Sequence, residues 1–150
     1  MQRISGVDLN HELAERSRGR GVEVIETDME TLLTPSKYDL VVSYGSLHHA
    51  ADTRQFVRTL GRLSNEYVLI VDNTVRRNIF HKVTGSRHFP LELSPYRIRS
   101  REEIVSAFDG EFDVVSSVTF RNANLFHDRS FVLARRLGGD APRKGPTTKI

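Results

Sequence analysis

Four short apolar runs of the sequence each end in an acidic or small polar residue, and these residue types suit the binding of a nucleoside. Asp8, Asp28 and Asp72 end three of the runs, and Ser43 with Gly45 ends the fourth. A carboxylate at a strand end accepts hydrogen bonds from a ribose diol, and a second carboxylate receives an adenine amine. Each aspartate taken singly more often caps a helix or turn. Their shared position favours a nucleoside-type cofactor, because parallel sheets bind ligands beyond the carboxyl ends of their strands.

Two adjacent histidines, His48 and His49, are the candidate acid–base groups. An imidazole titrates near neutral pH, so either side chain is suited to remove a proton from a reacting group. One histidine of such a pair is often structural, and the sequence does not decide which. A zinc site formed by both histidines and Asp52 is disfavoured, because no further ligand of the expected kind lies close in the sequence. The sequence has no Cys, which excludes thiolate metal sites, disulfides and a Cys nucleophile.

The elements that position these residues alternate between short apolar runs and helical patterns, which is typical of an α/β fold with a parallel sheet. The predicted strands cover residues 3–7, 22–26, 38–43 and 66–71, and the predicted helical segments cover residues 10–18, 29–33 and 52–63. Asn10 is the predicted cap of the first helix, and Asp52 with Gln55 forms the predicted capping box of the third. The run 38–43 is rich in β-branched residues, so we expect it to be buried on both faces.

The second half of the sequence follows a different pattern. Residues 74–95 are basic and contain scattered aromatic residues, and Ser100 with Glu103 predicts a capped helix through Phe108. Residues 112–120 and 129–136 are joined by only eight residues, so they are expected to pair as an antiparallel hairpin. Residues 1–137 are therefore the predicted domain, and residues 138–150 are the predicted disordered tail.

Three blocks of the sequence, residues 6–10, 26–30 and 38–49, resemble class I S-adenosylmethionine-dependent methyltransferases of the type 11 style. The resemblance covers about residues 3–136, and the block 38–49 is its most specific part. It implies a Rossmann-like sheet, mostly parallel with an antiparallel C-terminal hairpin, and methyl transfer from S-adenosylmethionine to a small-molecule acceptor. Because the sulfonium carries an activated methyl group, the main task of such a protein is to align the acceptor.

The resemblance also implies roles for individual residues. His48 and His49 begin the segment that faces the substrate, where a histidine would take the proton of the acceptor. Seven residues are implied to bind the cofactor: Asp8 at the ribose hydroxyls, Leu9 beside the adenine, Asp28 at the adenine amine, Met29 over the ring, and Ser43, Tyr44 and Gly45 at the methionine end.

One departure from this family pattern is large, because no glycine-rich strand and loop precedes Arg3. Gly19 and Gly21 follow a predicted helix, so they form a helix stop and not a cofactor loop. The first βα unit is therefore expected to be missing, as in a fragment, a chain completed by a partner or a degenerate relative. We expect weak or undetectable cofactor binding by this chain alone. We also expect self-association, or a partner chain that supplies the missing strand to the exposed edges.

Net charge and hydropathy restrict the classes of protein to which this sequence can belong. The 22 Lys and Arg residues exceed the 19 Asp and Glu residues by only three, which is small for a nucleic-acid-binding protein. The most apolar run, residues 67–71, is far shorter than the roughly 20 residues of a membrane helix, so a cytoplasmic protein is expected. The alternative function is a non-catalytic binding module that uses its basic segment for a protein or nucleic-acid partner. A nicotinamide oxidoreductase is disfavoured, because its glycine fingerprint is missing. The arginines that would meet an anionic acceptor are Arg76, Arg77, Arg97 and Arg99.

Overall fold

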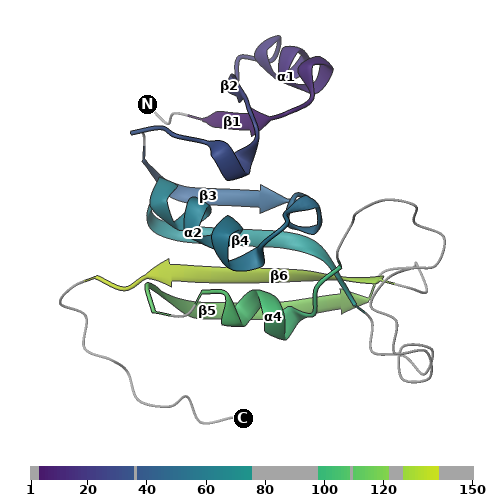
Figure 1. The fold of residues 1–150 in the computed structure, drawn as a ribbon, viewed down its shortest axis with the longest axis vertical. Coiled ribbons are helices and arrows are strands. Elements are labelled where there is room, and N and C mark those ends of the chain that lie inside the picture. Colours follow the sequence, from purple (N-terminus) through teal and green to yellow (C-terminus); the bar gives the residue numbers. More distant parts are fainter. Residues whose placement is uncertain (1–3, 36, 76–97, 109, 122–126, 139–150) are drawn as a thin grey trace.

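The computed structural model describes residues 4–35, 37–75, 98–108, 110–121 and 127–138 (Figure 1). Strands and helices alternate along the first half of the chain, and a strand pair closes the second half. In chain order the elements are β1 (Ser5–Asp8), α1 (His11–Arg18), β2 (Glu23–Glu26), the 3-10 helix η1 (Met29–Thr31), β3 (Tyr38–Tyr44), the 3-10 helix η2 (Leu47–His49), α2 (Thr53–Leu63), β4 (Ser64–Val75), α4 (Arg101–Ser106), β5 (Phe112–Arg121) and β6 (His127–Arg136).

The strands form two separate sheets. β1 and β2 are parallel and form a two-stranded sheet, while the second sheet has the order β3-β4-β6-β5 (Figure 1). β3 is parallel to β4, and β6 is antiparallel to both β4 and β5. The predicted parallel pairs and the predicted antiparallel hairpin are therefore confirmed. The expectation of one parallel sheet formed by all four N-terminal runs is wrong for the described residues. No backbone hydrogen-bond ladder joins β1 to β3, and β3 is an edge strand of the four-stranded sheet.

The helices begin at the residues that the sequence predicted as caps. The side chain of Asn10 accepts a hydrogen bond from the Leu13 amide at 3.1 Å, and the Asp52 carboxylate accepts from two amides of the first turn of α2. Ser100 and Glu103 form a reciprocal capping box at the start of α4. Each cap satisfies amide groups that have no partner inside the helix, so these short polar side chains fix where the helices start.

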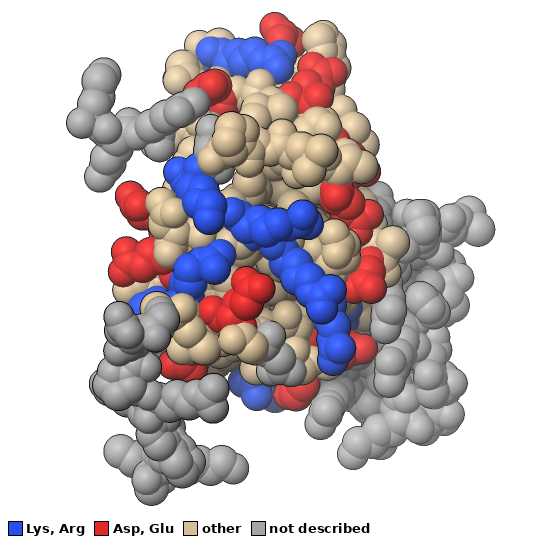
Figure 2. All heavy atoms as spheres, turned by 60° about the vertical axis from the view of Figure 1, so that its left-hand side comes forward, with Lys and Arg blue, Asp and Glu red and all other residues tan. Residues whose placement is uncertain are grey.

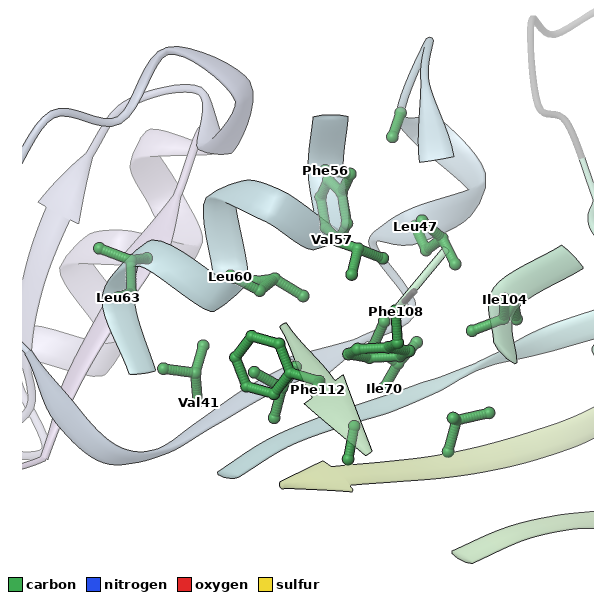
Figure 3. Packing of buried hydrophobic residues seen from close by; sticks show 14 of the residues in the cluster. Val41, Leu47, Phe56, Val57, Leu60, Leu63, Ile70, Ile104, Phe108 and Phe112 are labelled. Atoms are coloured by element: carbon green, nitrogen blue, oxygen red, sulfur yellow. The ribbon is translucent and has the colours of Figure 1, made fainter. Parts of the chain in front are cut away.

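The hydrophobic core lies between α2 and the four-stranded sheet (Figure 3). Residues three and four positions apart on α2 point toward the strands, and their spacing matches the helical repeat. From the sheet, Val68 and Ile70 of β4 reach the same core with no exposed surface. Phe108 and Phe112 fill the space beside them with their rings 6.0 Å apart. The buried side chains of α2 in this core are Phe56, Val57, Leu60 and Leu63.

The prediction that the run 38–43 is buried on both faces is wrong. Val41 and Ser43 are buried, but Leu40 and Val42 on the opposite face are 49% and 51% exposed. The physical reason is that α2 and α4 pack against the same side of the four-stranded sheet, in front of it in Figure 1. No described helix covers the other side of β3, so alternate residues of this strand reach solvent.

Several element boundaries differ from the predicted ones. β4 begins at Ser64 and continues to Val75, well past the predicted end, because β6 pairs with it from Tyr67 to Val75. α4 ends at Ser106, before the predicted Phe108. Most of the basic segment 74–95 and of the predicted tail 138–150 lies outside the described residues.

Gly61 of α2 offers a test of this packing. A Cβ atom at this position would lie 2.9 Å from Cε2 of the buried Phe112 ring. Alanine usually stabilises a helix interior by about 1 kcal/mol relative to glycine. Here the overpacking cost of about 1–3 kcal/mol dominates, so Gly61→Ala lowers the free energy of unfolding measured in urea.

Gly19→Ala is the matched control, because a Cβ atom there would lie at an ordinary 3.5 Å from the Glu15 carbonyl oxygen. Gly19 also has a right-handed helical backbone, with φ of −61°, which alanine adopts without strain. This variant keeps or slightly raises the stability. A Gly61→Ala protein as stable as the original would contradict the close approach of α2 to Phe112.

Candidate functional site

A cavity of about 970 Å³ lies where the two sheets approach each other. Its wall includes residues at the carboxyl ends of β1 and β3 and the residue that follows β2. Residues of η1, which comes after β2, and of η2, which comes after β3, complete the wall. The residues predicted to bind a cofactor all lie in this wall, and one of the two predicted histidines joins them. These residues are Asp8, Leu9, Asp28, Met29, Ser43, Tyr44, Gly45 and His49. His48 is not part of the wall.

The two predicted carboxylates of the cavity also act as local caps. Asp8 Oδ1 accepts a hydrogen bond from the Asn10 amide at 2.8 Å, and Asp28 Oδ1 accepts one from the Glu30 amide at 2.8 Å. The prediction that a single aspartate of this kind caps a helix or turn is therefore confirmed for Asp8 and Asp28. In each case the bonds between described residues engage Oδ1, so Oδ2 is left for a ligand.

The opposite wall of the cavity contains a buried polar atom with no partner. Ser43 is only 3% exposed, and its Oγ makes no hydrogen bond to any described residue. Gly45, two residues later, has a φ of +62°, a left-handed conformation that favours glycine, and its amide donates to the Val71 carbonyl at 2.8 Å. A buried hydroxyl without a partner costs free energy, and Ser43 is the residue of the cavity wall to which this applies among the described residues.

His48 is held by a buried carboxylate. Asp72 of β4 is 2% exposed, and its Oδ1 lies 2.8 Å from His48 Nδ1. Asp72 Oδ2 accepts a hydrogen bond from the Leu47 amide at 2.8 Å. An ionised carboxylate only accepts, so His48 Nδ1 is the donor of this hydrogen bond. Sequence reasoning placed Asp72 at a strand end but did not assign it to His48.

Arg99 holds the same turn from its other side. Its guanidinium donates to the carbonyl oxygens of Leu47 and Ala50 and to Thr53 Oγ1, and the residue is 2% exposed. From the sequence, Arg99 was expected to be a surface arginine that would contact an anionic acceptor. The structure shows it buried, so that part of the expectation is wrong. Arg76, Arg77 and Arg97 lie outside the described residues.

The two histidines differ in their surroundings, although their ring centres are only 4.2 Å apart. Removal of part of its ring from water lowers the pKa of His49 below the usual 6.5, and neighbouring His48 lowers it further. Asp72 acts in the opposite direction but does not reverse the shift. A histidine whose pKa lies below 6.5 is mostly neutral at pH 7, and the neutral imidazole is the form that accepts a proton.

Asp52, the third residue of the disfavoured zinc site, has a different task. Its carboxylate accepts hydrogen bonds from the Gln55 and Arg54 amides, and these bonds lower the pKa of Asp52. Among the described residues, no group of three His, Asp or Glu side chains is arranged to hold a metal ion.

Charged residues on the surface are mixed. Figure 2 shows Lys and Arg gathered across the middle of one face, with Asp and Glu on several sides of them. This face corresponds to the left-hand side of Figure 1, which is opposite to the end toward which the arrow of β3 points. The gathered cations therefore lie away from the carboxyl end of β3. Within the described chain, no helix is long and apolar enough to cross a membrane, and the cellular location stays a prediction.

Comparison by sequence gives one family. Residues 1–67 match the family described as "Methyltransferase domain". This segment contains all seven predicted cofactor residues and both histidines. No curated protein matches the chain by sequence.

Comparison by structure gives methyltransferase-like neighbours at low sequence identity. Magnesium protoporphyrin IX methyltransferase from Synechocystis PCC 6803, solved with bound SAM, is 13% identical with a TM-score of 0.64, and the match covers 90% of this chain and 60% of that one. The N-methyltransferase NodS from Bradyrhizobium japonicum WM9 is 14% identical with a TM-score of 0.65, over 89% of this chain and 73% of that one. The [4+2]-cyclase SpnF is 14% identical with a TM-score of 0.71, over 91% and 68%.

The chain thus spans 60% of the first of these neighbours. Fold similarity at this identity establishes architecture and not activity, as the presence of a cyclase among the neighbours illustrates. The chain has the fold of class I S-adenosylmethionine-dependent methyltransferases, and its first 67 residues match their methyltransferase domain.

Proposed function

We propose that this protein contributes to the transfer of a methyl group from S-adenosylmethionine to a small-molecule acceptor. The observation that carries the proposal is the single cavity in which residues from two separate sheets meet at the carboxyl ends of their strands. Neighbours with the same fold have been solved with bound SAM or S-adenosylhomocysteine, which supports the choice of cofactor. The fold alone does not identify the acceptor.

The residues of the cavity fit the parts of this cofactor. A volume of about 970 Å³ is ample for a nucleoside with an amino-acid side arm. Asp8 and Asp28 would accept hydrogen bonds from the ribose hydroxyls and the adenine amine, and Leu9 and Met29 offer apolar contacts to the ring. The orphaned hydroxyl of Ser43 would meet the polar methionine end. When bound, the cofactor supplies a methyl group on a positively charged sulfur that leaves as a neutral thioether.

His49 is the proposed proton acceptor, because it lines the cavity and is neutral at pH 7. When an acceptor hydroxyl or amine is methylated, its proton must leave, and a neutral imidazole within reach can take it. His48 has a positioning role in this proposal. Its hydrogen bond to Asp72, together with the bond from the Leu47 amide to the same carboxylate, holds η2 against β4. These bonds fix the position of His49, the last residue of η2.

Calorimetry with S-adenosylhomocysteine tests the cofactor assignment. We expect weak binding, because the described residues contain no strand, glycine loop and helix in the order that supplies backbone amides to a cofactor. Asp8→Asn retains the oxygen that caps Asn10 but loses the charge that the ribose requires. The loss of a hydrogen bond to a charged group is worth about 1.5–3 kcal/mol, so the dissociation constant rises about tenfold or more.

Asp39→Asn is the matched control, since Asp39 is an exposed carboxylate of β3 that does not line the cavity. The affinity of the Asp39→Asn protein for S-adenosylhomocysteine should equal that of the original protein. Equal affinity of the Asp8→Asn protein, or no binding of S-adenosylhomocysteine at millimolar concentration, would contradict the assignment.

NMR titration tests the proposed proton acceptor independently of any substrate. His49 should titrate with a midpoint below 6.5, because its pKa is lowered by loss of water contact and by His48. His11 is the internal control, since its hydrogen bond to Glu26 at 2.9 Å raises its pKa above 6.5. The His48→Gln variant should move the His49 midpoint upward. A His49 midpoint at or above that of His11 would remove the basis for a neutral imidazole at pH 7.

We also propose that the open edges of β1 and β3 recruit a strand from a second copy or from a partner chain. Among the described strands, β1 pairs only with β2 and β3 pairs only with β4. Neither strand contains the Lys or Pro residues that commonly protect an exposed edge. Unpaired backbone groups on a strand edge are satisfied when another strand adds to it.

Sedimentation velocity over a concentration series tests this assembly. The average mass should rise above the 17.1 kDa of one chain as the concentration increases. Leu40→Lys places a charge on the exposed side of β3 and should reduce the rise, whereas Leu137→Lys, outside the strands, should not. A mass of one chain at every concentration would contradict the recruitment of a second copy.

A further inference from the structure

A second, smaller groove of about 330 Å³ lies on the four-stranded sheet near the start of β6. It is lined by Phe120 and Arg121 of β5 and by Arg129 and Phe131 of β6. The two phenylalanine rings meet edge to face, with their centres 5.3 Å apart. The groove therefore combines two aromatic surfaces with two cations, and none of its four lining residues is acidic.

The aromatic surfaces of the groove are open. Phe120 is 56% exposed and Phe131 is 36% exposed, although both lie on regular strands. Exposed aromatic side chains that gather in one place mark a surface suited to a partner or ligand. An aromatic ring of a ligand gains both apolar contact and edge-to-face geometry there.

The cations of the groove have no acidic partner among the described residues. Neither Arg121 nor Arg129 lies within ion-pair distance of a described Asp or Glu. Arg129 is instead oriented by Tyr44, whose hydroxyl oxygen accepts a hydrogen bond from the guanidinium at 2.7 Å. The guanidinium carbon also lies 5.3 Å from the centre of the Tyr44 ring. A guanidinium has five N–H donors, so Arg129 retains donors for a planar anion.

Tyr44 links this groove to the larger cavity, because it lines that cavity and contacts Arg129. A molecule held at Arg129 and Phe131 therefore lies next to the methionine end of the proposed cofactor site. We propose that the groove is an acceptor subsite that binds an aromatic carboxylate, an assignment that rests on the methyl transfer proposed above. The ring packs on Phe120 and Phe131, and the carboxylate accepts hydrogen bonds from Arg129.

NMR titration with benzoate tests the subsite. Benzoate should shift the signals of Phe131 and of the Arg129 guanidinium in the full chain. Benzamide, which has the same ring without the charge, should bind about tenfold more weakly or worse. Cyclohexanecarboxylate, which has the charge without the aromatic ring, should bind about two- to tenfold more weakly. Benzamide that binds as tightly as benzoate, or benzoate that shifts neither signal at millimolar concentration, would overturn the proposal.

Variants separate the groove from the general positive charge of the surface. Arg129→Gln should weaken benzoate binding about tenfold or more, and Phe131→Leu should weaken it while keeping an apolar side chain. Arg54→Gln, which removes an exposed arginine of α2 outside the groove, should leave it unchanged. Equal losses in Arg54→Gln and Arg129→Gln would overturn the proposal.

Binding of S-adenosylhomocysteine to the same samples distinguishes this proposal from the one on which it rests. Benzoate binding at Arg129 without S-adenosylhomocysteine binding would contradict the proposed function and leave an aromatic-acid site with another purpose. S-adenosylhomocysteine binding without benzoate binding would contradict the acceptor subsite alone.

Discussion

Strand β4 is paired along both edges, and the burial of one of its faces is the constraint on which the rest of the structure depends. It runs parallel to β3 and antiparallel to β6, so it lies inside the four-stranded sheet. Because side chains alternate along a strand, Val68, Ile70 and Asp72 all point to the face that α2 covers. The two apolar residues form the centre of the core, while the third brings a carboxylate into a place with almost no water.

A buried carboxylate must be paired, and the way in which Asp72 is paired determines the shape of the candidate site. Its two oxygens bind the Leu47 amide and His48, which draws the turn after β3 onto β4. Arg99 then binds the carbonyl oxygens of Leu47 and Ala50. Buried groups of opposite charge therefore hold the two sides of one short turn, and His49 takes its place in the cavity wall because that turn is fixed.

The parts of this arrangement that depend on local chemistry could be predicted from the sequence. Asn10, Asp52 and Ser100 cap helices in the structure because a short polar side chain satisfies nearby amides whatever the rest of the chain does. Asp8, Asp28 and Ser43, which end three of the apolar runs, also line one cavity, although their strands belong to two sheets. The spacing of apolar residues on α2 likewise indicated the face that is buried.

The parts that depend on distant segments could not be predicted. Nothing in the neighbourhood of Arg99 distinguishes it from the surface arginines, because its burial is decided by carbonyl groups about fifty residues earlier. The position of β6 between β4 and β5 depends on a pairing across more than fifty residues, whereas the short connection indicated only that β5 and β6 are antiparallel. The open face of β3 depends on which side α2 and α4 both occupy.

The same reasoning explains how the cavity can join two sheets that share no backbone ladder. The described contacts between them are made by side chains: Glu30 accepts a hydrogen bond from the Ala51 amide at 3.2 Å, and Val7 and Met29 pack against the core of the other sheet. A ligand that contacts Asp8 on one side and Ser43 on the other would bridge both sheets. Its binding free energy then also holds the two parts of the fold together, because a ligand that binds only the assembled arrangement stabilises that arrangement. In this chain the proposed cofactor site and the junction between the sheets are the same place, so ligand binding there would be coupled to the cohesion of the fold.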